Sequence, residues 1–562
     1  MTAAPVESVA RRQRRLLLDS LLLGIGGAAS AQLFTLVLNV AQSLFLGRLA
    51  GYQPPGLVNE GGSPQEVIGR FGLWLVPVVA AVGGLFCGLL ITWLAPEAEG
   101  HGTDTAVRAF HRADGALRAR VPPLKMLASG LTIGSGGSAG REGPTALVAA
   151  GIGSWYAGIT HRSPEDRRLL LLIGMSAGLA AIFRSPIGTA LFSIEVLYAD
   201  MEFESGALLY TMLASVVAYA VNGVFTGFRP LFVIPAINNP ESIDYVWFTA
   251  LGLASGLVAV LLPLAFYYTR DLFHKLRIPP AVKPAIGALL TGVIALALPP
   301  VIGGGYGWMQ RAIDGQLLTL TLLLLVFAKT IAMSLTISSG GSGGVFAPSL
   351  YIGTMLGAFF AQVIHKTAAP FAIVGMAAVF AGAARVPMAT LMMVTEMTGG
   401  YTLLVAAALA VTISYIVQVR LSQHLRYKSL YQEQVPRRAD SPAHHTEHLE
   451  IALRILEQQR QVRPLEPAGE ALLERLRAGV PTELSNDRQL LVGSLRETSA
   501  WVGRGFGPER GKIDDEIEIL AIMRDERMIA PRPDVRMQAG DKLILLTTAA
   551  ALERVMLDVA PW

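Results

Sequence analysis

Charged residues are scarce in this chain of 562 residues, where Asp, Glu, Lys and Arg together make up 16% of the sequence. Soluble domains carry about 25% charged residues, so the composition excludes an ordinary soluble protein. Hydrophobic residues make up 52% of the chain, and its mean hydropathy of +0.48 indicates a membrane protein. A formal net charge of only +4 gives no reason to expect a nucleic-acid partner.

The chain has one cysteine, Cys87, which excludes an internal disulfide framework and does not identify a compartment. We predict no enzymatic activity, no cofactor and no metal site. A cleavable signal peptide is also not expected, because the apolar stretch from Leu16 is too long and lacks a small-residue cleavage site. The basic cluster at residues 11–15 precedes that stretch, so the positive-inside rule predicts a cytoplasmic segment over residues 1–15.

Long apolar segments follow one another from residue 16 to about residue 421, and a membrane span needs about 20 residues. The candidate spans are 16–47, 71–95, 205–226, 245–268, 317–337 and 401–419. Shorter segments, interrupted by Gly or Pro, are 144–158, 169–183, 186–198, 370–384 and 387–397. Because lipid cannot satisfy broken backbone, the short segments must be buried in protein or line a cavity. We predict an all-α, multi-pass transmembrane domain over residues 16–434, in the plasma (inner) membrane and surrounded by the lipid bilayer.

Two motifs occur twice, in the same order. GREGP (140–144) corresponds to GVFAP (344–348), and FRSPIGTALFSIE (183–195) corresponds to ARVPMATLMMVTE (384–396). The copies are separated by 204 and 201 residues, and each member of the first pair follows a run of Gly and Ser. Broken segments at corresponding places in two halves are typical of transporter folds whose site lies between the repeats.

Each glycine-rich run ends at a proline, Pro144 or Pro348, that we expect at the first position of a helix. The N–H groups of a first helical turn are unpaired and partly positive, and glycine lets an ion approach them. Two such helix starts that converge would bind an anion weakly enough to release it again. Since Arg141 and Glu142 stand where a phosphate-binding loop needs Lys and Ser or Thr, a nucleotide site is not expected.

Glu142 is the candidate gate of this site. An ionised carboxylate as a helix cap gains about 0.3–1 kcal/mol, whereas an ionisable residue at membrane depth costs roughly 2.5–3.5 kcal/mol. A functional role therefore explains Glu142 better than capping does. Its carboxylate would compete with an anion for the helix start, and its protonation would release the site.

The motifs GREGP, GGVFAP and RVPMATLMMVTEMTGGY (385–401) closely resemble those of the CLC chloride channels and proton-coupled chloride transporters. The resemblance covers roughly residues 70–435. It implies an inverted-repeat fold of many tilted and broken helices, and a homodimer with one pathway for chloride or a similar small anion in each subunit. It also implies that Glu142 is the gate, that Tyr431 or, alternatively, Tyr427 is the inner tyrosine, and that certain backbone amides face the anion: Arg141, Glu142, Gly143, Val345 and Phe346. An interfacial aromatic is the other reading of the tyrosine.

The chain departs from the family pattern at two places. Gly100, His101 and Gly102 stand where the family has Gly-Ser-Gly, so His101 replaces the serine that contacts the central anion. Its imidazole is either a pH-sensitive donor or a neutral residue that donates one hydrogen bond. Val196 follows Glu195 where proton-coupled members have a second glutamate, and valine cannot transfer protons. This favours a passive channel; the alternative is a proton-coupled chloride antiporter that also carries protons.

Residues 303–307 (GGGYG) contain the Gly-Tyr-Gly of potassium selectivity filters. The full TVGYG is missing, and CLC proteins have a similar glycine-rich stretch here. We therefore do not predict potassium conduction.

After about residue 434 the composition becomes polar. Residues 435–479 are predicted to form a linker and an amphipathic helix (447–477), and residues 480–562 a small cytoplasmic α+β domain. Its expected elements are strands at 517–523 and 542–547, a turn at 538–541 and a helix at 549–558. Residues 516–546 (EIEILAIMRDERMIAPRPDVRMQAGDKLILL) resemble the TrkA C-terminal (RCK C-lobe) regulatory module. The resemblance implies either a small-molecule ligand or a role in dimerisation alone. An even number of membrane crossings would place this domain in the cytoplasm together with the N-terminus.

Overall fold

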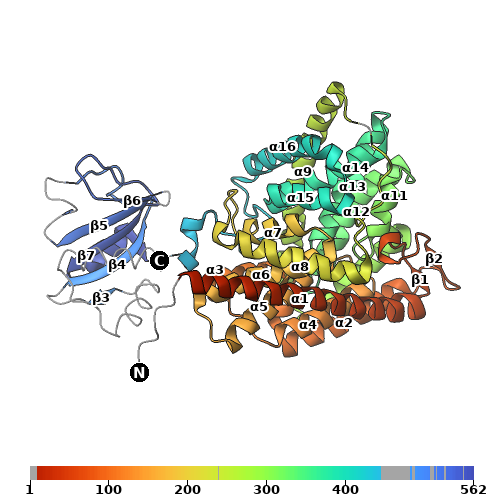
Figure 1. The fold of residues 1–562 in the computed structure, drawn as a ribbon, viewed down its shortest axis with the longest axis horizontal. Coiled ribbons are helices and arrows are strands. Elements are labelled where there is room, and N and C mark those ends of the chain that lie inside the picture. Colours follow the sequence, from red (N-terminus) through yellow and green to blue (C-terminus); the bar gives the residue numbers. More distant parts are fainter. Residues whose placement is uncertain are drawn as a thin grey trace. The chain divides into compact units, whose positions relative to one another are not determined.

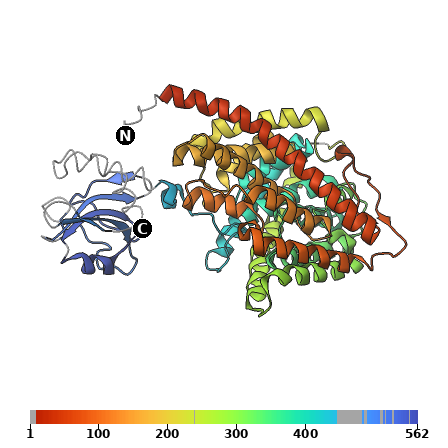
Figure 2. The ribbon, with the colours of Figure 1, turned by 90° about the horizontal axis from the view of Figure 1, so that it is seen from below.

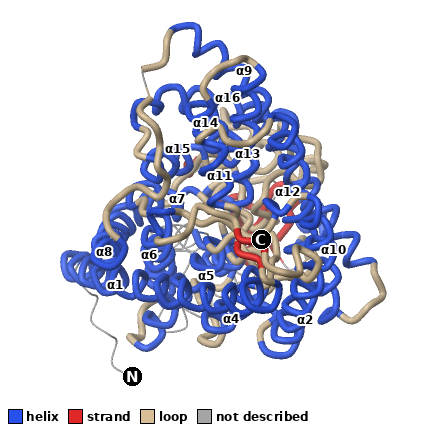
Figure 3. The backbone as a smooth tube through the Cα atoms, turned by 90° about the vertical axis from the view of Figure 1, so that its right-hand side faces the viewer, coloured by secondary structure: helices blue, strands red, loops and turns tan. Residues whose placement is uncertain are grey.

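The computed structural model describes residues 9–237, 239–444, 481–483, 488–506, 512–513, 516–524, 527–548 and 550–561. The chain divides into two compact units, Met1–Pro436 and Arg437–Trp562 (Figure 1). Helices make up most of the first unit (Figure 3). The predicted linker and amphipathic helix lie largely outside the described residues.

The first unit contains two sets of helices in the same order. The first set is α1 (Val9–Gln42), α2 (Val76–Leu94), α3 (Thr103–Arg112), α4 (Val121–Gly134), α5 (Glu142–Ile159), α6 (Pro164–Phe183), α7 (Pro186–Glu195) and α8 (Leu208–Thr226). The second set is α9 (Ser242–Lys275), α10 (Lys283–Ala297), α11 (Tyr306–Ile313), α12 (Thr319–Ser338), α13 (Phe346–Val363), α14 (Ala368–Ala384), α15 (Pro387–Thr398) and α16 (Leu404–Ser422). A short hairpin of β1 (Tyr52–Gln53) and β2 (Val67–Ile68) lies between α1 and α2.

The contacts between helices in the first set correspond to those in the second set. Helix α1, which crosses the unit obliquely in Figure 2, packs against α6 and α8, while α9 packs against α14 and α16. Helix α5 lies along α6 as α13 lies along α14, and α7 packs against α15 across the two halves. The internal repeat predicted from the paired motifs is therefore confirmed in three dimensions.

Corresponding glycines let the paired helices approach closely. A Cβ atom at Gly153 of α5 would collide with the carbonyl oxygen of Leu170 on α6. A Cβ atom at Gly357 of α13 would collide with the carbonyl oxygen of Phe371 on α14. Inside a membrane the hydrophobic effect does not drive helices together. Helices there associate through close van der Waals packing, which small residues such as these glycines permit.

Among the described residues, 8 helices are long and apolar enough to cross a membrane. The two that the sequence did not predict as spans are Pro280–Ala297 and Phe346–Val363. Both have 18 residues and contain glycine, and neither was among the predicted short segments. The predicted short segments form α5, α6, α7, α14 and α15.

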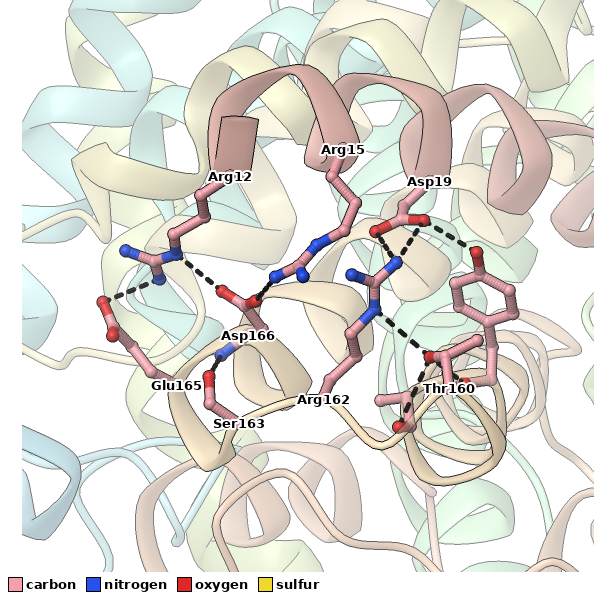
Figure 4. A network of polar contacts seen from close by, with 10 residues as sticks. Arg12, Arg15, Asp19, Thr160, Arg162, Ser163, Glu165 and Asp166 are labelled. Carbon is pink, nitrogen blue, oxygen red and sulfur yellow. Dashed lines mark hydrogen bonds and ion pairs between the residues drawn. The ribbon is translucent and has the colours of Figure 1, made fainter. Parts of the chain in front are cut away.

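The basic start of α1 is joined to the corner between α5 and α6 (Figure 4). Arg12 and Arg15 donate hydrogen bonds of 2.8 and 2.6 Å to the carboxylate of Asp166. Arg162 donates to both carboxylate oxygens of Asp19, at 2.9 and 2.8 Å. These pairs neutralise the charges that would oppose burial and fix one end of α1. Helix α1 begins at Val9, so it includes the basic cluster that precedes the apolar stretch from Leu16.

The second unit is an antiparallel sheet with the order β3-β4-β7-β5-β6, and β8 pairs with β4. The strands are β3 (Thr482–Glu483), β4 (Arg488–Leu495), β5 (Ile517–Arg524), β6 (Arg527–Ile529), β7 (Lys542–Thr548) and β8 (Val559–Pro561), with helix α19 (Leu552–Asp558). Strands β5 and β7 and helix α19 confirm three predicted elements. Strand β4, which pairs along most of β7, was not predicted individually.

Candidate functional site

Three glycine-rich loops from distant parts of the sequence meet inside the first unit. Gly140 and Gly344 exchange two backbone hydrogen bonds of 2.8 and 2.6 Å. Gly100 donates to the carbonyl of Gly341 at 3.1 Å and accepts from the amide of Gly343 at 3.2 Å. Because these bonds join the residues just before α3, α5 and α13, they bring three helix N-termini together.

The two predicted helix starts form part of this cluster. Helix α5 begins at Glu142 and α13 at Phe346, and neither N-cap residue, Arg141 or Val345, caps its helix through its side chain. The first-turn amides therefore keep their partial positive charge. Gly143 lies against the carbonyl of His101, where a Cβ atom would collide.

The prediction that Pro144 and Pro348 take the first helical position is wrong. Each is the third residue of its helix. The amide at that position has no intrahelical partner either, so proline costs no hydrogen bond there.

The side chain of Glu142 lies over the cluster and is only 1% exposed. Tyr306, the first residue of α11, donates a hydrogen bond from its hydroxyl to Oε1 of Glu142. A Cβ atom at Gly140 would collide with the Glu142 carboxylate and lie 3.2 Å from the nitrogen of Ala347. The carboxylate is therefore beside the start of α13 as well as at the start of its own helix.

The Arg141 side chain lies close to the Glu142 carboxylate and to Tyr306. Its guanidinium forms an ion pair with Glu60 and lies 5.4 Å from the centre of the Tyr306 ring. Its Nε atom is 4.0 Å from Oε1 of Glu142. Arg141 and Tyr306, together with Arg184, line a cavity of about 670 Å³. The cavity is also lined by Glu60, so the buried carboxylate lies next to residues of a cavity that carries both basic and acidic groups.

His101 occupies a second part of the site. Its Nε2 atom lies 3.2 Å from Oδ2 of Asp104, and its ring centre lies 5.4 Å from that of Tyr431 and 6.0 Å from that of Phe266. Its buried Nδ1 atom has no hydrogen-bond partner in the described part of the chain. The structure therefore brings His101 and Tyr431 together, whereas Tyr427 bonds Asp271 elsewhere. Contact of these residues with an anion remains a prediction.

Two buried lysines were missed by the sequence analysis. Lys125 on α4 donates to the carbonyls of Ala98 and Gly100, at 2.8 and 2.7 Å. Lys329 on α12 donates in the same way to the carbonyls of Val301 and Gly303, at 2.8 and 2.6 Å. The two lysines are 204 residues apart, as the paired glycine motifs are. A single charge within an apolar segment, repeated at that spacing, was the available signal.

The paired glutamates of the second motif bond across the two halves. Glu195 at the end of α7 accepts from the amides of Met388 and Ala389 at the start of α15, at 3.1 and 2.6 Å. Glu396 of α15 accepts from the amides of Ile187 and Gly188 at the start of α7, at 3.2 and 2.9 Å. Each carboxylate caps the partner helix, which gives Glu195 a structural role.

Inverted halves whose helix starts meet at a buried carboxylate define a membrane protein for the passage of small anions. The sequence model described as "Voltage gated chloride channel" matches residues 83–419, and the model described as "TrkA-C domain" matches residues 508–557. The chain belongs to the CLC family of chloride transport proteins and carries a TrkA-C domain. It is a multi-pass membrane protein.

The similar bacterial proteins include some named as chloride channels and some named as proton-chloride exchange transporters. A putative chloride channel protein ClcB-like of Ralstonia nicotianae is 29% identical over 354 residues, which are 61% of this chain and 82% of the relative. The H(+)/Cl(-) exchange transporter ClcA of Salmonella arizonae is 30% identical over 376 residues, 64% of this chain and 78% of the relative. The voltage-gated ClC-type chloride channel ClcB of Salmonella typhimurium is 29% identical over 432 residues, 75% and 98% respectively.

Solved structures share the fold. A CLC-type fluoride/proton antiporter matches with a TM-score of 0.64 and 22% identity, over 76% of this chain and 100% of that chain. A slow cyanobacterial Cl-/H+ antiporter matches with a TM-score of 0.64 and 22% identity, over 74% and 96% respectively. The predicted inverted-repeat fold is confirmed.

Proposed function

We propose that the chain is a passive chloride channel gated by Glu142. The observation that best supports this proposal is the buried carboxylate of Glu142, which lies beside the starts of both α5 and α13. A carboxylate at these partly positive ends occupies the place that a chloride ion would take. When a proton neutralises it, the amides become available to the anion and the pathway opens.

Val196 supports passive conduction. It follows Glu195 directly, is fully buried and has no group that binds a proton. Proton-coupled chloride exchange is the second candidate, because the protonatable pair of His101 and Asp104 lies at the same loop cluster. The exchangers among the relatives make the same alternative worth testing.

The reversal potential of the reconstituted protein separates these two mechanisms. For a passive channel we expect it to follow the chloride gradient and to stay constant when a pH gradient is imposed at fixed chloride. Planar bilayer recordings with equal chloride and a pH difference of about two units provide the measurement. A reversal potential that moves with the proton gradient establishes exchange and overturns the channel proposal.

His101→Ser is expected to remove a pH-dependent part of chloride binding. A protonated imidazole donates a charge-assisted hydrogen bond, which is about 1 kcal/mol stronger than a neutral one, so acid should strengthen chloride binding about fivefold in the parent. Chloride affinity measured by isothermal titration at pH 5.5 and 7.5 should change about fivefold more in the parent than in the variant, which keeps only the pH dependence due to Glu142. His365→Ser, at an exposed turn, is the control. The same change of affinity with pH in the parent and in His101→Ser would assign His101 the neutral role.

We also propose a homodimer with both termini in the cytoplasm. The basic residues that begin α1 support this orientation through the positive-inside rule. The TrkA-C domain is proposed to bind a small-molecule regulator, and its buried core, which includes Trp501, Phe506 and Leu543, gives it a rigid framework for doing so.

A further inference from the structure

We propose that Tyr306 is a positioning residue for the gate, and that its phenol holds the ionised carboxylate of Glu142 in the closed pathway. This inference rests on the proposed role of Glu142. The contact that carries it is the hydrogen bond from the Tyr306 hydroxyl to Oε1 of Glu142. It also gives a function to the Gly-Tyr-Gly of residues 303–307, which the family resemblance left without one.

The loop before Tyr306 is fixed from two sides. Lys329 donates to the carbonyl of Gly303 at 2.6 Å, and the amide of Gly303 donates to the carbonyl of Gly137 at 3.1 Å. Gly305 has a φ of +78°, and a Cβ atom there would also collide with the Tyr351 ring, so a glycine is required directly before α11. The loop therefore acts as a rigid support that aims one phenol at the carboxylate.

The charged groups around Glu142 do not supply the hydrogen bond that the Tyr306 phenol donates to it. Arg141 is the nearby cation, at 4.0 Å from Nε to Oε1, and Glu60 offsets its charge by pairing with the same guanidinium. The first residues of α13, Phe346 and Ala347, are uncharged. The phenol thus contributes a directed hydrogen bond that the more distant and already paired guanidinium does not supply.

This hydrogen bond favours the closed state because a phenol bonds an ionised carboxylate more strongly than a neutral carboxyl group. Opening adds one proton from water to Glu142 and weakens that bond. Tyr306 itself neither gains nor loses a proton. Its removal should therefore make the carboxylate easier to protonate and shift opening to higher pH.

The test compares Tyr306→Phe with Tyr351→Phe in proteoliposomes, with chloride efflux measured from pH 4 to pH 8. We expect Tyr306→Phe to raise the pH of half-maximal efflux by about one unit. Tyr351 is a matched control, because it lies on α13 beside the same loop and its buried hydroxyl has no hydrogen-bond partner among the described residues. Tyr351→Phe should leave the profile unchanged. Equal profiles for the two variants would overturn the proposal.

A second pair of measurements separates this proposal from the gate itself. In a Glu142→Gln background, Tyr306→Phe should cause no further shift, and a shift of the same size there would show that Tyr306 acts independently of Glu142. If Glu142→Gln alone leaves the pH profile intact, the proposed gate fails. Should Tyr306→Phe not fold, 3-fluorotyrosine at position 306 keeps the ring and is more acidic. It should move half-maximal efflux to lower pH, and an unchanged profile overturns the proposal.

Discussion

Replacing Glu142 by glutamine is expected to raise chloride flux at pH 7.5 about tenfold and to remove most of its pH dependence. A neutral amide keeps the shape of the protonated gate but binds the helix-start amides and the Tyr306 hydroxyl less strongly than a carboxylate does. The difference between charged and neutral hydrogen bonds is about 1–1.5 kcal/mol, which corresponds to about a factor of ten. Chloride efflux from proteoliposomes between pH 4 and pH 8 measures both effects.

Glu195→Gln is the matched control for this variant. Glu195 is a buried glutamate too, but its carboxylate accepts hydrogen bonds from the start of α15. The amide oxygen of glutamine can still accept from that helix start, so its pH profile should follow the parent. If Glu142→Gln retains the parent profile, Glu142 is not the gate.

Lys125→Met and Lys329→Met are expected to cause the largest losses of stability. Each substitution leaves two buried carbonyl oxygens without their donor, at about 1–3 kcal/mol each, so the free energy of unfolding should fall by about 2–6 kcal/mol. Thermal unfolding in detergent, detected by size-exclusion chromatography, measures this loss of stability. Lys366→Met is the control, since Lys366 is 40% exposed in its ion pair with Asp244 and such pairs contribute little.

The two lysine variants should also differ in function. Lys125 fixes the loop that carries His101, so Lys125→Met should mainly weaken chloride binding. Lys329 fixes the loop before Tyr306, so Lys329→Met should mainly shift the pH of opening upward. Unfolding midpoints within about 2 °C of the parent would contradict the structural role of both lysines.

The sequence predicted the parts of the site that local chemistry specifies. Glycine before a helix start and a carboxylate in an apolar region are each unusual enough to identify residues 140–143 and their counterpart. Tyr306 could not be found in this way, because its role depends on α11 approaching α5 from 164 residues away. Lys125 and Lys329 could have been found, since a charge inside an apolar helix is itself a signal.

The sequence predicted the repeated segments and six of the membrane-spanning helices. The two spans that it missed are short, with 18 residues each. Pro280–Ala297, a helix of 18 residues that contains glycine, was predicted neither as a span nor as a short segment. Strand β4 depends on pairing with β7, and the two- and three-residue strands β3, β8 and β6 depend on pairing with β4 or β5. A prediction from one short window of sequence does not include these pairings.

The crossed capping of α7 and α15 has a mechanical consequence. Moving one half of the repeat relative to the other would withdraw Glu195 from α15 and Glu396 from α7 at the same moment. A rocking motion of one half against the other would therefore have to break these four backbone hydrogen bonds together. Such a tie agrees with the gating proposed for Glu142, in which a single side chain moves and the two halves stay in place.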